Sequence, residues 1–161
     1  MATDPLLKLL TKNAKFTTTE LAERAGIPEA EVIAKIEAWE KDGTILGYQA
    51  VVDREKADSQ AVSAFIEVKL TPERGGGFDR LAMRIARFEQ VTSCYLASGG
   101  YDLMLVVEGQ SLRHIASFVS EKLSSIDGVL SCATHFRLKT YKEKGFLFEV
   151  EESEGRLPVT P

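Results

Sequence analysis

The chain contains 161 residues, of which 20 are basic and 24 acidic, and its formal net charge of −4 matches a pI near 5.3. These ordinary globular values exclude collagen-like, fully disordered and membrane-spanning classes. The first residues lack the basic segment of a secretory signal, and two cysteines are too few for a disulfide framework. We therefore expect a cytoplasmic protein with no membrane partner. The acidic balance gives no general sign of nucleic-acid binding.

Residues 1–52 are predicted to form three short helices followed by a strand. Asp4 can cap the first helix, with Pro5 at its first position. The second helix has a clearer start, because Thr17 and Glu20 have the spacing of a capping box, and Gly26 can end it.

The third helix is predicted over residues 28–42, after a turn of only Gly26, Ile27 and Pro28. Its apolar positions, including Ile33, are expected to face the core. A turn this short makes two helices cross steeply, which indicates a helix-turn-helix. Residues 45–52 read as a strand, giving a winged version of that domain.

The second half of the chain has a different periodicity. Residues 53–60 are polar and are interpreted as a linker, and from residue 62 apolar and polar side chains alternate, as in a half-buried strand. The order of elements then predicts a ferredoxin-like βαββαβ sandwich over residues 61–140, and an α+β fold class for the whole chain. Cys94 and Cys132 would lie on opposite edges of its sheet, too far apart for a disulfide.

The elements expected after the first strand of this domain follow in chain order. They are a helix over 78–87, strands over 91–98 and 101–108 joined by a two-residue Gly99–Gly100 turn, a helix capped by Ser111, and a strand over 129–138. An extra edge strand and a mobile acidic tail are expected within 141–161.

Three stretches carry a resemblance to a known family. They are ELAERAGIPEAEV (20–32), KDGTILGYQAVVD (41–53) and YLASGGYDLMLVV (95–107). In this order and spacing the chain resembles the Lrp/AsnC family of transcriptional regulators over roughly residues 4–140. The resemblance implies DNA binding by the first domain, and dimerisation and binding of a small effector, most often an amino acid, by the second. It also implies that dimers assemble further into tetramers or octamers.

One face of the predicted sheet needs a cover. Both helices of a βαββαβ unit lie on the same face, so the other face is expected to carry Phe65, Met104 and Val106. Leaving such side chains in water would forgo roughly 1.5 to 3 kcal/mol each. A homodimer or larger assembly follows if a second copy covers this face; the alternative is a monomer covered by its own linker and tail.

The hairpin Ser98-Gly99-Gly100-Tyr101-Asp102 is the candidate effector site. Its glycines leave backbone N–H groups open to a carboxylate, and Asp102 can pair with an ammonium group, so the loop suits a zwitterion. Taken alone, the same residues favour a tight turn that uses glycine for backbone shape alone. The resemblance implies an effector pocket around this loop that also includes Thr134.

The third helix is the candidate reader of double-stranded DNA, although its charge opposes this role. It holds two lysines against five acidic residues, where relatives usually carry several arginines, and Pro28 stands where most relatives have Ser or Thr. Several readers in one assembly can compensate for weak individual contacts. The alternative is a small-molecule sensor or assembly partner that no longer binds DNA. Candidate DNA contacts are Thr18, Thr19, Glu29, Ala30, Lys35 and Lys41.

An enzymatic role is not expected. The chain has only two histidines, His114 and His135, and they do not form a zinc spacing with the two cysteines. It contains no nucleophile elbow, phosphate-binding loop or dinucleotide motif. We expect no catalytic residue, no metal and no cofactor.

Overall fold

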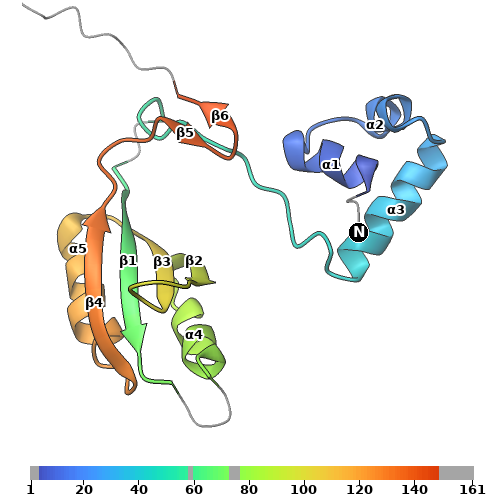
Figure 1. Ribbon diagram of the computed structural model, residues 1–161. Helices are drawn as coiled ribbons and strands as arrows, with labels where there is room; N and C mark the ends of the chain where they lie inside the picture. The colour runs from blue at the N-terminus through green and yellow to red at the C-terminus, as the bar shows by residue number, and fades with distance from the viewer. Residues whose placement is uncertain (1–3, 58–59, 73–76, 149–161) are drawn as a thin grey trace, which may run out of the picture. The chain divides into compact units, whose positions relative to one another are not determined.

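The computed structural model describes residues 4–57, 60–72 and 77–148. They divide into two compact units between Ala50 and Val51, slightly before the predicted boundary (Figure 1). None of the helices in these described ranges is long and apolar enough to cross a membrane.

The first unit is a three-helix domain. It consists of α1 (Pro5–Lys12), α2 (Thr18–Ala25) and α3 (Glu29–Lys41). The predicted caps are confirmed: Asp4 accepts from the Leu6 backbone N–H at 2.8 Å, and Thr17 with Glu20 forms a complete capping box. One side chain was wrongly assigned to the core, because Ile33 is 43% exposed. The buried residues of this unit are Leu6, Leu10, Leu21 and Val32, with Ile36 and Trp39 packed beside them.

The strand predicted over residues 45–52 is wrong, because none of these described residues belongs to a strand. The start of this segment is used to close α3 instead, since the Ile45 N–H donates to the Trp39 carbonyl at 2.9 Å. Further along, the Tyr48 hydroxyl donates to Glu40 at 2.8 Å. Within the described residues, the helix-turn-helix therefore has no wing.

The second unit has the predicted βαββαβ order. Its strands form one antiparallel sheet in the order β2-β3-β1-β4, which is the ferredoxin-like arrangement. Cys94 and Cys132 lie on opposite edge strands as free thiols, and burial raises the pKa of both. The elements are β1 (Val62–Leu70), α4 (Asp79–Ala86), β2 (Val91–Leu96), β3 (Leu103–Gly109), α5 (Leu112–Ser117), the π-helix η1 (Phe118–Leu123) and β4 (Val129–Phe136).

Alternate residues of the central strands form the core of this unit with the helices. Ala64, Ile66 and Val68 of β1 are completely buried. They pack with buried residues of the helices, which are Leu81 and Ile85 of α4 and Ile115, Phe118 and Leu123 of the α5–η1 segment. Both helices therefore cover the same face of the sheet. No helix among the described residues of this unit covers the opposite face of the sheet.

Two local predictions were wrong. The β2–β3 connection is longer than a two-residue turn: it comprises Ala97–Asp102 and is closed by a hydrogen bond from Ala97 N–H to the Asp102 carbonyl (2.9 Å). The expected extra edge strand is instead a separate small ribbon of β5 (Lys142–Glu143) and β6 (Phe146–Leu147). The acidic tail predicted at the end of the chain lies outside the described residues.

Candidate functional site

The helix-turn-helix brings the start of α2 against the start of α3. Gly26 ends α2 in the left-handed region, with φ +69°, so the chain reverses within three residues. The hydroxyls of Thr18 and Thr19 both donate to Glu29 Oε1, the latter at 3.2 Å. Three predicted DNA contacts are thus grouped in one hydrogen-bonded cluster between the two helices.

Lys35 has a structural partner that sequence reasoning missed. Its ammonium group lies 3.2 Å from Asp4 and 3.4 Å from Glu31. The Leu6 N–H and then Lys35 hold the pKa of Asp4 below its ordinary value, and the hydrogen bond to Asp4 raises the pKa of Lys35. The pair joins α3 to the cap of α1, so Lys35 serves the fold of the domain. Ala30 and Lys41, the remaining candidate contacts, are exposed on α3.

The candidate effector loop is anchored by Asp102. Its carboxylate Oδ2 accepts from the Leu70 N–H at 2.7 Å, and its own N–H donates to the Val68 carbonyl at 3.0 Å. These bonds hold the loop against the end of β1. The β2–β3 connection is therefore longer than a tight hairpin turn. Ser98, Gly99 and Gly100 remain exposed, and Tyr101 is half-buried.

Thr134 lies two strands away from that loop. It is on β4 opposite Ile66 of β1, and Ile66 in turn lies opposite Leu105 of β3. Cross-strand neighbours share a face of the sheet, so Thr134 is on the helix-covered face near one edge. Neither Thr134 nor the loop lines the cavity described below.

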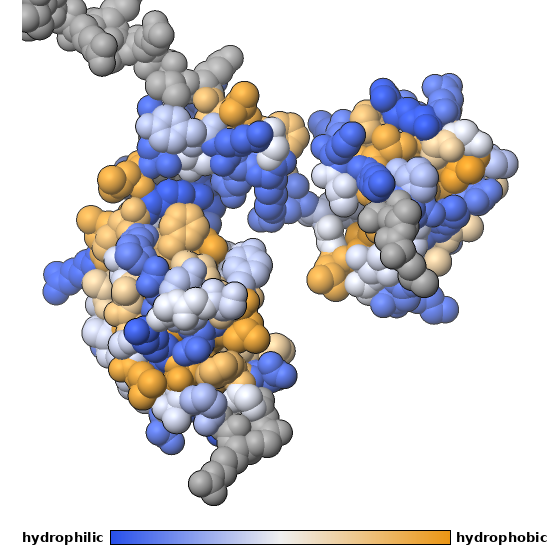
Figure 2. All heavy atoms as spheres, in the orientation of Figure 1, coloured by the Kyte–Doolittle hydropathy of each residue, from blue (hydrophilic) through white to orange (hydrophobic). Residues whose placement is uncertain are grey.

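The open face of the sheet brings together the three residues predicted for an interface. Phe65 lies opposite Val106, and Met104 occupies the next position of the same face, opposite Glu67. Phe65 is 39% exposed and the neighbouring Tyr95 is 58% exposed. Apolar residues are scattered among polar ones on the visible surface of this unit (Figure 2). On the same face, His135 Nε2 lies 3.4 Å from Glu67 Oε1.

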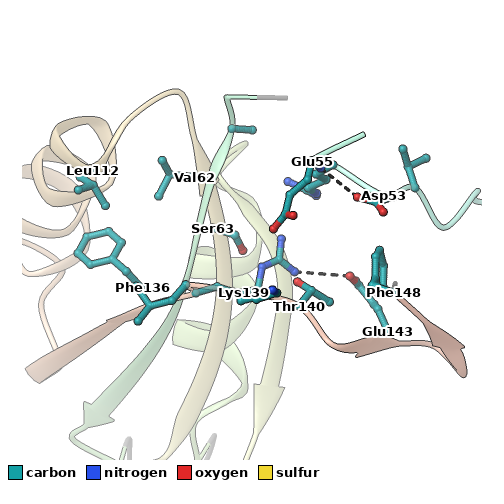
Figure 3. Close-up of a pocket in the computed structure, with 15 residues that line it drawn as sticks. Asp53, Glu55, Val62, Ser63, Leu112, Phe136, Lys139, Thr140, Glu143 and Phe148 are labelled. Carbon is teal, nitrogen blue, oxygen red and sulfur yellow. Dashed lines mark hydrogen bonds and ion pairs between the residues drawn. The ribbon is translucent and has the colours of Figure 1, made fainter. Parts of the chain in front are cut away.

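A cavity of about 370 Å³ lies in the second unit between residues 52–55, the start of β1 and the segment after β4 (Figure 3). Arg137, with its side chain 18% exposed, lines it and lies 3.5 Å from Glu143. The hydroxyl of Ser63 is buried there without a hydrogen-bond partner among the described residues. Sequence reasoning missed both residues, because no local pattern distinguishes them from solvated positions of a strand end.

Comparison with known proteins identifies the family. Residues 63–146 match the family model of the Lrp/AsnC ligand binding domain. The chain is also 45% identical, over 157 residues, to the uncharacterized HTH-type transcriptional regulator YugG of Bacillus subtilis (strain 168). This alignment covers 97% of this chain and 95% of that protein. The chain belongs to the Lrp/AsnC family. The HTH-type transcriptional regulator LrpA of Pyrococcus horikoshii is a further relative of this Lrp/AsnC protein, 32% identical over 77% of this chain and 85% of its own length.

Solved structures share the fold of this Lrp/AsnC chain. The leucine response regulatory protein LrpA of Mycobacterium tuberculosis has a TM-score of 0.70 over 86% of this chain and 92% of its own, at 24% identity. The regulator NMB0573 of Neisseria meningitidis, solved as a complex with L-Met, has a TM-score of 0.65 at 24% identity, covering 86% of this chain and 88% of its own. The chain is a transcriptional regulator of the Lrp/AsnC family, with a ligand-binding domain that contains the candidate loop, Thr134 and the open face.

Proposed function

We propose that this regulator senses an amino acid or a similar small metabolite bound between subunits of a homodimer or larger assembly. The observation that carries the proposal is the uncovered face of the sheet, where Phe65, Met104 and Val106 lie side by side. A second copy of the same face would remove these side chains from water. The effector would then bind where the loop of one subunit meets its partner.

The chemistry of the loop favours a zwitterion. Exposed Gly99 and Gly100 offer backbone N–H groups to a carboxylate, and Asp102 offers an acceptor to an ammonium group through Oδ1, the oxygen that does not bond to Leu70. Ser98, Tyr101 and Thr134 would complete the site. The complex of the Neisseria regulator with L-Met supports an amino acid as the class of ligand.

Signal transfer would follow from assembly. An effector that binds one arrangement of subunits better than another shifts the population toward it, and with it the spacing of the DNA-reading helices. We propose a non-catalytic role for the chain. A cytoplasmic location is proposed because a transcriptional regulator works in the compartment that holds the DNA.

One observation favours the alternative of a sensor that has lost DNA binding. Lys35, one of only two lysines on α3, is held by Asp4 and Glu31, which leaves the exposed face of that helix dominated by carboxylates. Phosphate contacts supply most of the sequence-independent affinity for DNA, so a single reader would bind weakly.

Titration of the full-length protein onto the DNA upstream of its own gene, at two salt concentrations, separates the two functions. We expect saturable binding that weakens as salt rises, because counterions are released from DNA on binding. Absence of binding even at low salt would establish the sensor instead.

The effector is tested by thermal shift with the twenty amino acids, coupled to mass measurement by light scattering. We expect one or a few amino acids to raise the melting temperature and to change the mass of the assembly. A flat response to the whole panel would contradict the proposed amino-acid effector.

A further inference from the structure

We propose that Glu29 is a specificity-determining residue, which accepts a hydrogen bond from the N4 amino group of a cytosine in the major groove. The proposal rests on the DNA-reading role of α3 and names what one of its residues reads. It starts from the cluster at the beginning of α2 and α3. Thr18 and Thr19 lie eleven and ten residues before Glu29 and donate to the same atom, Oε1.

The two hydroxyls fix the orientation of an exposed carboxylate. Pro28, the residue before Glu29, makes no side-chain cap, so the link between the helix starts comes from Glu29 itself. Binding to DNA normally restricts a Glu side chain to one rotamer, which costs conformational entropy. Because the two hydroxyls already hold Glu29 in the folded domain, this cost is met on folding and not on binding. Oε1 receives both hydroxyls, while Oε2 receives neither of them.

The position of Glu29 in a helix-turn-helix determines what Oε2 can meet. In this motif the first helix crosses the DNA backbone, and the first residues of the second helix contact base edges in the major groove. Glu29 is the first residue of α3. A carboxylate only accepts hydrogen bonds.

Among the base edges of the major groove, cytosine suits a carboxylate best. Guanine presents two acceptors and thymine one, and adenine sets its N7 acceptor beside its amino donor, whereas cytosine presents its N4 donor. Near the phosphates the negative charge of Glu29 opposes binding to every sequence. Its contribution is therefore selective: we expect about tenfold discrimination in favour of cytosine at one position of each half-site.

The test is selection of binding sites from a randomised duplex library by the full-length wild-type protein and by two variants. E29Q keeps an oxygen for the two hydroxyls but places an amide donor where Oε2 stood, so we expect the selected cytosine to be replaced by a base with an acceptor edge. E29A removes both the link and the acceptor, and we expect no base preference at that position.

E31Q is the matched control. It removes one carboxylate from the same helix, two residues along and about 200° around it, where Glu31 contacts Lys35. We expect E31Q to select the wild-type motif. The double variant T18V/T19V keeps the charge of Glu29 but removes both donors, and should weaken the cytosine preference at the same position.

The outcomes separate this inference from the proposed function. A wild-type protein that selects no motif would overturn the DNA-reading role of α3, and the inference with it. A wild-type motif that E29Q and E29A both reproduce unchanged would overturn the inference alone. E29Q retains the link between the helices, so it remains informative if E29A fails to fold.

Discussion

The carboxylate of Asp102 has two roles. One oxygen makes a structural hydrogen bond, and the other belongs to the proposed effector site. Oδ2 is used by the Leu70 N–H, which fixes the β2–β3 loop to β1, and Oδ1 is left for a ligand. The structural bond needs only an acceptor, whereas an ammonium group is attracted by the negative charge. Substitutions that keep the acceptor can therefore separate the two roles.

We predict that D102N retains the melting temperature of the wild type to within a few degrees but loses at least about tenfold in affinity for the amino acid that stabilises the wild type. D102A should lose both affinity and stability, because the Leu70 N–H is left without its acceptor. Calorimetric titration and thermal melts measure the two effects. Full affinity in D102N would place the ammonium group elsewhere.

The contact between Asp4 and Lys35 makes the stability of the first unit depend on pH. The folded-state pKa of Asp4 is lowered, so its contribution is present above the ordinary value of 3.8 and is lost as the pH falls through the folded pKa. The pKa of Lys35 is raised, so its contribution is present below 10.5 and is lost as the pH rises through its folded pKa.

We predict that D4N, which keeps an acceptor for the Leu6 N–H, is less stable than wild type at neutral pH and that this difference disappears in acid. The fluorescence of Trp39 during urea unfolding of the full chain measures it, since the chain has one tryptophan and it packs in the core of the first unit. A difference that persists below the folded pKa of Asp4 would show that the ion pair is not its source.

At the scale of elements, the start of α2 depends on its capping box. Thr17 and Glu20 satisfy each other's backbone N–H groups. We predict that T17A lowers the free energy of unfolding of the first unit by about 1 kcal/mol, while T17S, which keeps the hydroxyl, stays close to wild type. Urea unfolding followed by Trp39 measures both variants, and equal loss in T17S would exclude the cap as the cause.

The elements that sequence reasoning predicted correctly depend on neighbouring residues. Caps, the Gly26 stop and the alternation of β1 are local patterns, and the βαββαβ order follows from them. The features that it missed depend on distant partners: Lys35 pairs with Asp4 across 31 positions, and Asp102 bonds to Leu70 across 32. Residues 45–52 have the composition of a strand, but forming one needs a second strand, and no strand in the described part of the chain pairs with them.

For the candidate sites too, the sequence predicted what depends on neighbouring residues and missed what depends on distant ones. Sequence placed Phe65, Met104 and Val106 on one face because strand periodicity determines the side on which a residue lies. The sequence indicated Thr18, Thr19 and Glu29 only as separate candidates. The hydrogen bonds among them depend on how the two helices cross, which local patterns do not determine. Ser63 and Arg137 gave no signal, because the cavity they line is formed by segments more than 70 positions apart.

At the scale of the whole molecule, the proposed assembly depends on the open face of the sheet. Each contact across a two-fold axis occurs twice, so one substitution changes two sites in the dimer. We predict that F65E shifts the protein from dimer or larger to monomer at micromolar concentration, with a dissociation constant raised at least about a hundredfold, because a buried carboxylate replaces an apolar ring. The fold of the monomer should survive, since Phe65 is already 39% exposed in the single chain.

Light scattering of the full chain measures the mass, and circular dichroism verifies that the variant is folded. M83E is the matched control, because Met83 is 58% exposed on α4, in the layer that covers the other face of the sheet, and the same charge there should leave the dimer intact. If F65E keeps the wild-type mass while it is folded, the open face is not the interface. The subunits would then associate through another surface, and the regulator could not couple ligand to DNA through this pairing of sheets.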